Sequence, residues 1–161
     1  MSQGPRIVFT RFLSGDSPKL VPWVAHLRHV MPGAPQVGAV IDVGEGAIVW
    51  QLVSANNRHL ARSVAIHSNF EDAAASARAV IAAGADLLVE LVSQPNRGSY
   101  GWFALDGEAP VMSCSRWYLT PRDRRHSIAL ALRSLDQAEL HSGVRLVHQA
   151  LRETAPEPFL A

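Results

Sequence analysis

The sequence predicts an α+β fold, in which one antiparallel sheet is built from repeated β-meander–helix–strand units with the helices on one face. The first observation is a shared spacing of 52 positions between three pairs of residues: Trp50 and Trp102, Ser63 and Ser115, and Ser68 and Thr120. The second is that an amphipathic helical pattern follows each set of landmarks. One spacing shared without a gap indicates an internal repeat.

Composition indicates a single packed domain. The chain has 161 residues, of which 48% are hydrophobic and 18% charged, so disorder is not expected for most of it. Its formal net charge of +1 gives no overall field to attract nucleic acid or an anionic membrane. The lone Cys114 excludes an intramolecular disulfide and favours a reducing, cytoplasmic location. No apolar run approaches the length of a membrane span, so no membrane partner is expected.

The first part of the chain predicts a strand, a helix and a strand. Arg6–Leu13 alternates loosely between its two faces, as a strand does. Ser17 is suited to cap a helix over Pro18–Met31, with proline at the first helical position. Pro32–Pro35 ends this helix. Val37–Val43 is apolar and β-branched, and therefore predicts a strand.

A meander and a second helix follow. Ala47–Ser54 and Leu60–Ile66 predict two strands joined by a turn whose asparagines tolerate positive φ. Ser68 is the expected cap of a helix over Phe70–Ala83. The small alanines of that helix would let it lie close to a sheet. The next glycine ends the helix, and Leu87–Val92 predicts a strand.

The same plan then returns. Tyr100–Leu105 and Val111–Ser115 predict a hairpin joined by an Asp-Gly-Glu turn. Thr120 and the proline after it are expected to start a helix over Arg122–Leu135. Val144–His148 predicts the closing strand.

These elements divide the chain into units of one compact fold. The expected units are a partial repeat over 1–43, a full repeat over 44–92, a linker over 93–99, a second full repeat over 100–150, and a tail over 151–161. The linker is expected because residues 93–99 combine proline, glycine and polar side chains. The partial repeat is expected because its strand, cap, helix and strand follow the order of residues 60–92.

The two tryptophan-containing stretches share a motif with a known family. The first copy consists of Trp50, Leu52, Ala55, Asn56, Ser63 and Ser68, with Asn57 and Ile66 at two divergent positions. The second copy consists of Trp102, Asp106, Gly107, Glu108, Ser115, Tyr118 and Thr120. Over about residues 39–135 the chain thus resembles the YegP-like family of small domains of unknown function. The resemblance implies a continuous antiparallel sheet shared between repeats, with helices on one face, and no established activity.

Three clusters are candidates for chemistry, and a structural role is favoured for each. Asp42–Gly46 resembles a glycine-rich ligand turn, but a strand pattern rather than a helix follows it, which favours a hairpin turn. His26 and His29 lie one helical turn apart, with no further ligand at metal-site spacing. Ser113–Ser115 lies on a predicted strand without the sharp turn of a nucleophile elbow. No catalytic residue, metal ligand or cofactor is therefore predicted.

The candidate binding surface is the arginine-rich start of the third helix. Cations in a first helical turn are disfavoured by the helix dipole, by about 0.3–1 kcal/mol each, and only Asp123 offsets them. An anionic partner would explain this placement, and aromatic residues just upstream would add stacking surface. The candidate partner-binding residues are Arg116, Trp117, Tyr118, Arg122, Arg124 and Arg125. The alternative is a solvated basic turn neutralised by Glu108 or by another chain.

These features favour a non-enzymatic interaction module that recognises an anionic partner through this arginine-rich turn. The partner would be a protein or a nucleic acid, and a homodimer would form through a sheet edge or an uncovered apolar face. Two alternatives stay open. One is a nucleic-acid-binding protein that uses the same six residues. The other is a small-molecule enzyme or ligand-binding protein with a site between the repeats, although no carboxylate pair, metal cluster or activated nucleophile supports it.

Overall fold

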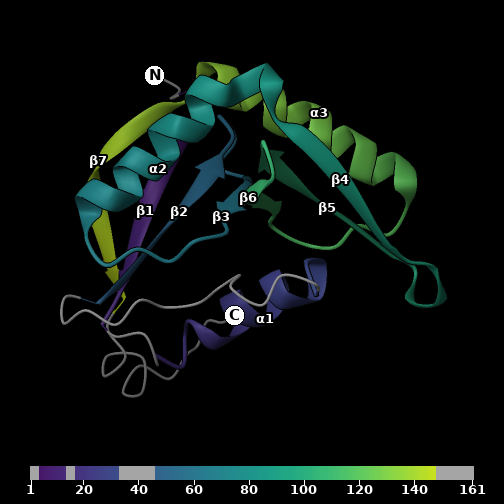
Figure 1. Ribbon diagram of the computed structural model, residues 1–161, viewed down its shortest axis with the longest axis horizontal. Coiled ribbons are helices and arrows are strands. Elements are labelled where there is room, and N and C mark those ends of the chain that lie inside the picture. Colours follow the sequence, from purple (N-terminus) through teal and green to yellow (C-terminus); the bar gives the residue numbers. More distant parts are fainter. Residues whose placement is uncertain (1–3, 14–16, 33–45, 148–161) are drawn as a thin grey trace.

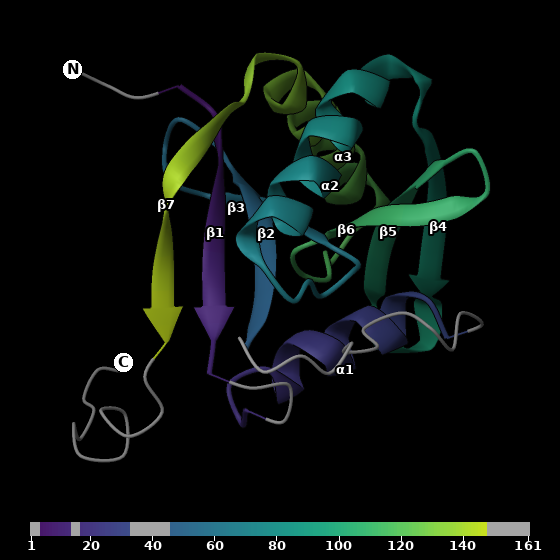
Figure 2. The same cartoon turned by 60° about the vertical axis from the view of Figure 1, so that its left-hand side comes forward.

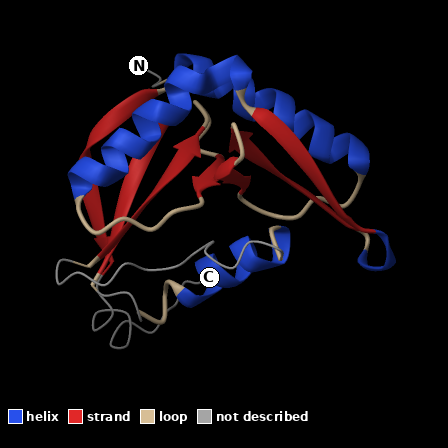
Figure 3. Cartoon of the chain, viewed as in Figure 1, coloured by secondary structure: helices blue, strands red, loops and turns tan. Residues whose placement is uncertain are grey.

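The structure is a computed structural model that describes residues 4–13, 17–32 and 46–147. Figures 1 and 3 show the helices and strands of these ranges. The strands are β1 (Arg6–Phe12), β2 (Ala47–Val53), β3 (His59–Ser63), β4 (Leu88–Gln94), β5 (Ser99–Asp106), β6 (Ala109–Cys114) and β7 (Glu139–Val147). The helices are α1 (Val21–Val30), α2 (Phe70–Ala83) and α3 (Pro121–Gln137), with short 3-10 turns at Gly84–Asp86 and Pro95–Arg97. The predicted strand Val37–Val43, all of the turn Asp42–Gly46 except Gly46, and the tail 151–161 lie outside the described residues.

In the part of the chain that the structure describes, the strands form one seven-stranded sheet in the order β4-β5-β6-β3-β2-β1-β7. Neighbouring strands are antiparallel except β1 and β7, which run parallel. The predicted α+β class and largely antiparallel sheet are therefore confirmed. The parallel pair was not predicted. It arises because β7 follows α3, which brings the chain back to the far edge of the sheet beside β1 (Figure 2).

The helices cover both faces of the sheet. Phe9 of β1 meets Phe70 of α2 edge to face, with ring centroids 4.9 Å apart. On the other face, the guanidinium of Arg62 on β3 lies 4.3 Å from the ring centroid of Trp23 on α1. Figure 1 shows α2 and α3 on the outer side of the bent sheet and α1 across its inner side. The prediction that all three helices pack on one face is therefore wrong for α1. The physical reason is that β2 is buried along both of its faces, so each face needs a cover.

Helix α1 begins later than predicted. It starts at Val21 rather than Pro18, and residues 18–20 form a turn in which the backbone N–H of Leu20 donates to the Ser17 carbonyl at 2.9 Å. Pro22 explains the shift, because a proline lacks an N–H and is tolerated only in the first helical turn. The later start places Pro22 where no intrahelical hydrogen bond is lost.

The caps of α2 and α3 are side chains that accept a backbone N–H. Thr120 caps α3 as predicted, and its Oγ1 accepts from the N–H of Asp123 at 3.0 Å. The cap of α2 is Asn69 and not the predicted Ser68, since Asn69 Oδ1 accepts from the N–H of Asp72 at 2.8 Å. Asparagine is at least as good a cap as serine, so the neighbouring residue takes the role.

Two tryptophan–serine hydrogen bonds join the sheet to the outer helices. Trp50 Nε1 donates to Ser76 Oγ on α2 at 3.1 Å, and Trp102 Nε1 donates to Ser127 Oγ on α3 at 3.0 Å. Both tryptophans have no exposed surface. A buried indole N–H without an acceptor would cost about 1–3 kcal/mol, so each serine satisfies the polar atom of a large core side chain.

The neighbouring strand supplies a second matching contact. The backbone N–H of Trp50 donates to Ser63 Oγ at 3.1 Å, and that of Trp102 donates to Cys114 Sγ at 3.4 Å. Ser115, which the shared spacing matched to Ser63, is therefore displaced by one position. The turn between β5 and β6 is shorter than that between β2 and β3, so the landmarks do not keep one spacing throughout.

We predict that Ser127→Ala lowers the free energy of unfolding by about 1–3 kcal/mol, because it leaves the Trp102 indole N–H buried without an acceptor. Urea denaturation followed by tryptophan fluorescence measures the loss. Asp136→Ala, an exposed site on the same helix, is the control and is expected to stay within about 0.5 kcal/mol of the parent. Equal stability of the two variants would contradict a structural role for this bond.

Candidate functional site: an arginine-lined cleft

The sheet splits near its middle, and a cleft opens at the split. Strands β3 and β6 pair at only three positions: Ala61 with Cys114, Arg62 with Ser113, and Ser63 with Met112. Past Cys114 the chain leaves β3 and runs along β5 instead, where Tyr118 pairs with Tyr100. The first residues of β3 and the segment after β6 therefore diverge, and α3 lies over the gap.

The resulting hollow has a volume of about 850 Å³, which is within the range of small-molecule sites, about 300–1,000 Å³. We call it the arginine cleft. The lining side chains on which its chemistry depends are Arg58, Arg62, Arg116, Tyr118, His126 and Arg133. They come from the β2–β3 turn, from β3, from the segment after β6 and from α3. Asp123 is the one acidic residue among the described residues that line it.

Helix α3 presents one stripe of side chains to the cleft. Asp123, His126, Leu130 and Arg133 recur every three or four residues and therefore lie on one face of the helix. Buried residues such as Ser127 and Ala131 occupy the adjacent stripe that faces the sheet. The cap at Thr120 fixes where the helix begins, and so fixes which side chains face the cleft.

The β2–β3 turn holds Arg58 at the cleft. Ser54 Oγ accepts from the backbone N–H groups of Asn56 and Arg58 at 3.2 and 3.1 Å. Asn57 adopts a positive φ of 66°, which asparagine tolerates better than most residues. Arg6 donates to the side-chain oxygen of Asn57 and ties the turn to β1. These hydrogen bonds fix the backbone of the turn that carries Arg58, while the side chain of Arg58 is exposed.

Arg62 forms the floor of the cleft. Its Nη2 donates to the Ser115 carbonyl at 3.0 Å, and its guanidinium stacks on Trp23. Its Nε is buried without a hydrogen-bond partner, and so is Ser115 Oγ. Burial lowers the pKa of Arg62 to about 10, and within residues 4–13, 17–32 and 46–147 no carboxylate contacts it. Arg62 is thus a charged but partly desolvated group with unused donor capacity, facing an open hollow.

The structure brings two of the six predicted partner-binding residues into this cleft. Arg116 and Tyr118 line it together, and the exposed guanidinium of Arg116 lies 5.2 Å from the ring centroid of Tyr118. Trp117, between them, points to the inner face of the sheet, where its ring meets His26 edge to face at 6.2 Å. A Cβ at Gly101 would lie 2.9 Å from this indole, so glycine at that position makes room for it.

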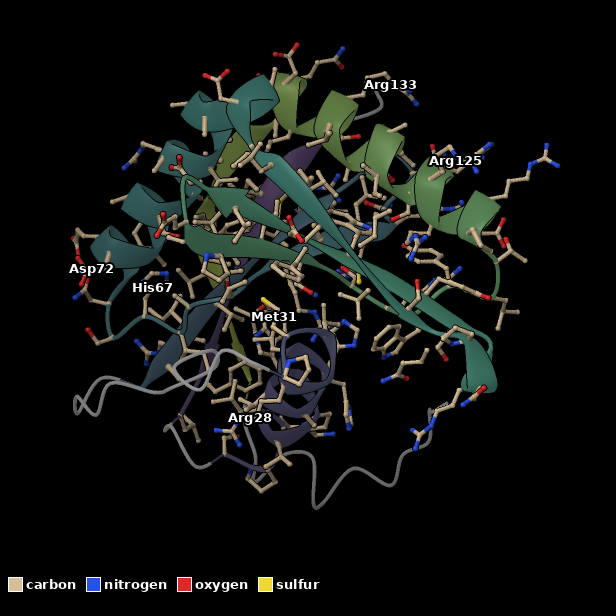
Figure 4. All side chains as sticks on the ribbon, turned by 45° about the vertical axis from the view of Figure 1, so that its right-hand side comes forward. Arg28, Met31, His67, Asp72, Arg125 and Arg133 are labelled. Carbon is tan, nitrogen blue, oxygen red and sulfur yellow. The ribbon has the colours of Figure 1, made fainter. Side chains whose placement is uncertain are left out.

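The other three predicted residues lie apart from the cleft. Arg124 is buried: its Nη1 donates to the Val92 carbonyl at 3.1 Å and to Ser93 Oγ at 2.9 Å, and it lies over the Tyr100 ring. Arg122 and Arg125 are exposed and do not line the cleft. Figure 4 shows Arg125 and Arg133 along α3, with Arg28 of α1 on the opposite side of the sheet. Arg124 therefore fastens α3 to β4 instead of pointing to solvent.

Sequence reasoning missed the residues that complete the cleft. Arg58, Arg62, His126 and Arg133 are distant in sequence and meet only through the pairing of β3 with β6. One signal was present: Arg62 lies within the predicted strand Leu60–Ile66, whose other residues except Ser63 are apolar. An arginine in such a run is either paired or functional.

The other candidate groups have structural surroundings. His26 is half-buried, and its Nε2 lies 2.8 Å from the Cys114 carbonyl oxygen, so this nitrogen carries the proton. His29 is exposed. Cys114 and Ser113 are fully buried, and burial raises the pKa of the Cys114 thiol. Among the described residues, no group of three His, Cys, Asp or Glu side chains is placed to hold a metal ion.

The fold and cleft define a class of α+β domain: a bent, mostly antiparallel sheet with two helices outside, one inside, and an arginine-lined opening between its halves. Within this class the chain is similar to yegP from E. coli, a protein of unknown function whose structure was solved by NMR. The similarity has a TM-score of 0.54 at 11% sequence identity, and covers 89% of this chain and 96% of that one.

The resemblance to the YegP-like family is thus confirmed at the level of the fold. No family model matches the sequence, and no curated protein matches it. Among the described helices, none has the length and apolar character needed to cross a membrane.

We predict that stability falls as the pH is lowered from about 7.5 to about 5. Burial lowers the pKa values of His26 and His67 in the folded state. Below the ordinary histidine pKa of about 6.5, the unfolded chain therefore binds protons that the folded protein does not, which favours unfolding. Figure 4 shows His67 close to Asp72, whose charge partly opposes its shift.

Urea denaturation at a series of pH values measures this effect. His26→Gln keeps a donor for the Cys114 carbonyl but cannot titrate. The free energy of unfolding of this variant is therefore expected to change less with pH than that of the parent. His29→Gln, on the exposed side of α1, is the matched control and should follow the parent. An unchanged slope in His26→Gln would show that His26 does not carry the effect.

Proposed function

We propose that the protein is a non-enzymatic binding module that holds an anionic group in the arginine cleft. The observation that carries this proposal is Arg62, a partly desolvated guanidinium in the arginine cleft that no carboxylate of the described residues contacts. An anion bound in the cleft would balance the charge of the Arg62 guanidinium, which lines the hollow.

The charge of the cleft supports the same proposal. Among the residues that the structure describes, four arginines and one carboxylate, that of Asp123, line it, whereas the whole chain has a formal charge of only +1. Positive charge is therefore concentrated at the cleft. Low-dielectric walls focus such a field and raise the local concentration of anions.

We also propose that the two halves of the sheet are copies of one ancestral unit. The paired tryptophan–serine bonds and the caps at Asn69 and Thr120, 51 positions apart, support this. The residues 51 positions before Arg116, His126 and Arg133 are Ala65, Ala75 and Ala82. Arg116, His126 and Arg133 thus have no basic counterpart in the first copy, which contributes Arg58 and Arg62 to the cleft instead.

A homodimer through the sheet edge is a further part of this proposal. Strand β4 is the outer strand on one side, and on it Leu88 and Leu91 are 57% and 59% exposed. An exposed apolar edge strand is a template for pairing with another strand. We expect the protein to be dimeric by light scattering at micromolar concentration, and Leu91→Lys to be monomeric. A monomeric parent protein would reject the dimer without bearing on anion binding.

We predict that inorganic phosphate and sulfate bind at low ionic strength, and that Arg62→Ala weakens them by at least about tenfold, the effect of one charge-assisted hydrogen bond. Isothermal titration calorimetry measures the affinities. Arg78→Ala, an exposed arginine on α2, is the matched control and should bind as the parent does.

Two measurements keep this test informative if Arg62 also supports the fold. Circular dichroism checks that Arg62→Ala is folded, and Ser115→Ala removes a smaller group from the same floor. If the folded variants and the Arg78→Ala control lose the same affinity, or if the parent binds neither anion, the arginine cleft is not an anion site.

A further inference from the structure

We infer that the arginine cleft takes a small molecule with two anionic groups held apart, such as a bisphosphate, with one group at each end of the cleft. This inference rests on the proposed anion-binding function and adds the class of ligand. The observation that supports it is the distribution of the four arginines along the cleft, since they form two separate pairs.

The inner pair lies at the floor. Arg62 and Arg116 are joined through the segment that follows β6, because Arg62 donates to the carbonyl of Ser115 and Arg116 is the next residue. Ser115 Oγ and Arg62 Nε, both buried and unpaired, lie at this end. The inner end therefore offers the charges of Arg62 and Arg116.

The outer pair lies at the mouth. Arg58 and Arg133 are both exposed, and both also line a second hollow of about 270 Å³ beside the β2–β3 turn. Arg58 comes from the β2–β3 turn and Arg133 from α3, yet both line the arginine cleft and the second hollow. The guanidinium groups of Arg58 and Arg133 thus lie at the same exposed end of the cleft. No acidic residue is among the described residues that line the second hollow.

The two ends are separated by more than the size of one anionic group. Arg58 precedes Arg62 by four residues, from the β2–β3 turn into β3, so at about 3.3 Å per residue at most about 13 Å of backbone separates them. On the opposite wall, His126 and Arg133 are seven residues apart, or about 10 Å along a helix. Arginine side chains can bend toward each other, so a ligand whose anionic groups lie roughly 6–12 Å apart fits this arrangement.

The middle of the cleft favours a compact ligand over a polymer. Leu130 and Tyr118 also line the cleft and supply apolar and aromatic surface. The cations face each other across the hollow from several elements, whereas a nucleic-acid strand is tracked by cations along a continuous groove. A single molecule with two charged ends and a neutral body matches the lining better.

A series of α,ω-alkylbisphosphonates serves as a molecular ruler for the test. Spacers of one, three, six and ten methylene groups are titrated into the full-length protein, with methylphosphonate as the reference for one anionic group. We expect the six-carbon compound to bind about tenfold or more tighter than methylphosphonate, since the second group binds at a high effective concentration. The one-carbon compound should gain little, because it does not reach both pairs.

Variants at the two ends separate this inference from the proposed function. Arg58→Ala with Arg133→Ala should abolish the gain from the second anionic group, so that the ratio of the six-carbon bisphosphonate affinity to the methylphosphonate affinity, both measured in this variant, falls toward one. Both sites are exposed, so the double variant is expected to fold. Affinity that does not depend on spacer length, with methylphosphonate still bound through Arg62, would overturn the inference but keep the anion site. Tighter, strongly salt-dependent binding of a single-stranded oligonucleotide than of any bisphosphonate would also overturn it.

Discussion

Three residue pairs between β3 and β6 hold the two halves of the sheet together. This short ladder is the constraint on which the rest of the structure depends. It is long enough to make one sheet, and it places Trp50 and Trp102 under separate helices in one core. It is also short enough that the strands part beyond Cys114, and that separation creates the arginine cleft. A longer ladder would pair the backbone along the whole of β3 and close the opening.

The same residue type has opposite roles on the two sides of α3. Arg124 is buried, but its guanidinium donates to Val92 and Ser93 and lies over Tyr100, so its charge is compensated within the protein. Arg62 is less buried, yet it keeps an unpaired Nε, and no carboxylate in the described part of the chain contacts it. The two arginines thus differ in whether the protein itself hydrogen-bonds the whole guanidinium group. On our proposal, Arg62 is the one that a ligand would bind.

Much of the fold could be predicted from the sequence, because it depends on local patterns. The paired tryptophans, the cap at Thr120 and the alanine-rich helix each have a signature within a few residues. The position of α1 could not be predicted in this way, since helical periodicity shows an apolar stripe but not which face of a sheet receives it. Of the candidate site, Arg116 and Tyr118 were found through their proximity to Thr120. Arg58 and Arg133 are 75 positions apart in the sequence, and only the tertiary fold brings them together.

The parallel pairing of β1 with β7 has a consequence for biosynthesis. In the described structure β1 lies between β2 and β7, and Arg6 is paired with Glu139. When a ribosome has made β1 and β2, one edge of β1 therefore still lacks its neighbour, because β7 begins 86 residues after the end of β2. At a translation rate of about 5–20 residues per second, that edge waits on the order of ten seconds. The nascent chain is then most open to mispairing with other chains, and a chaperone that shields β1 would act in this interval.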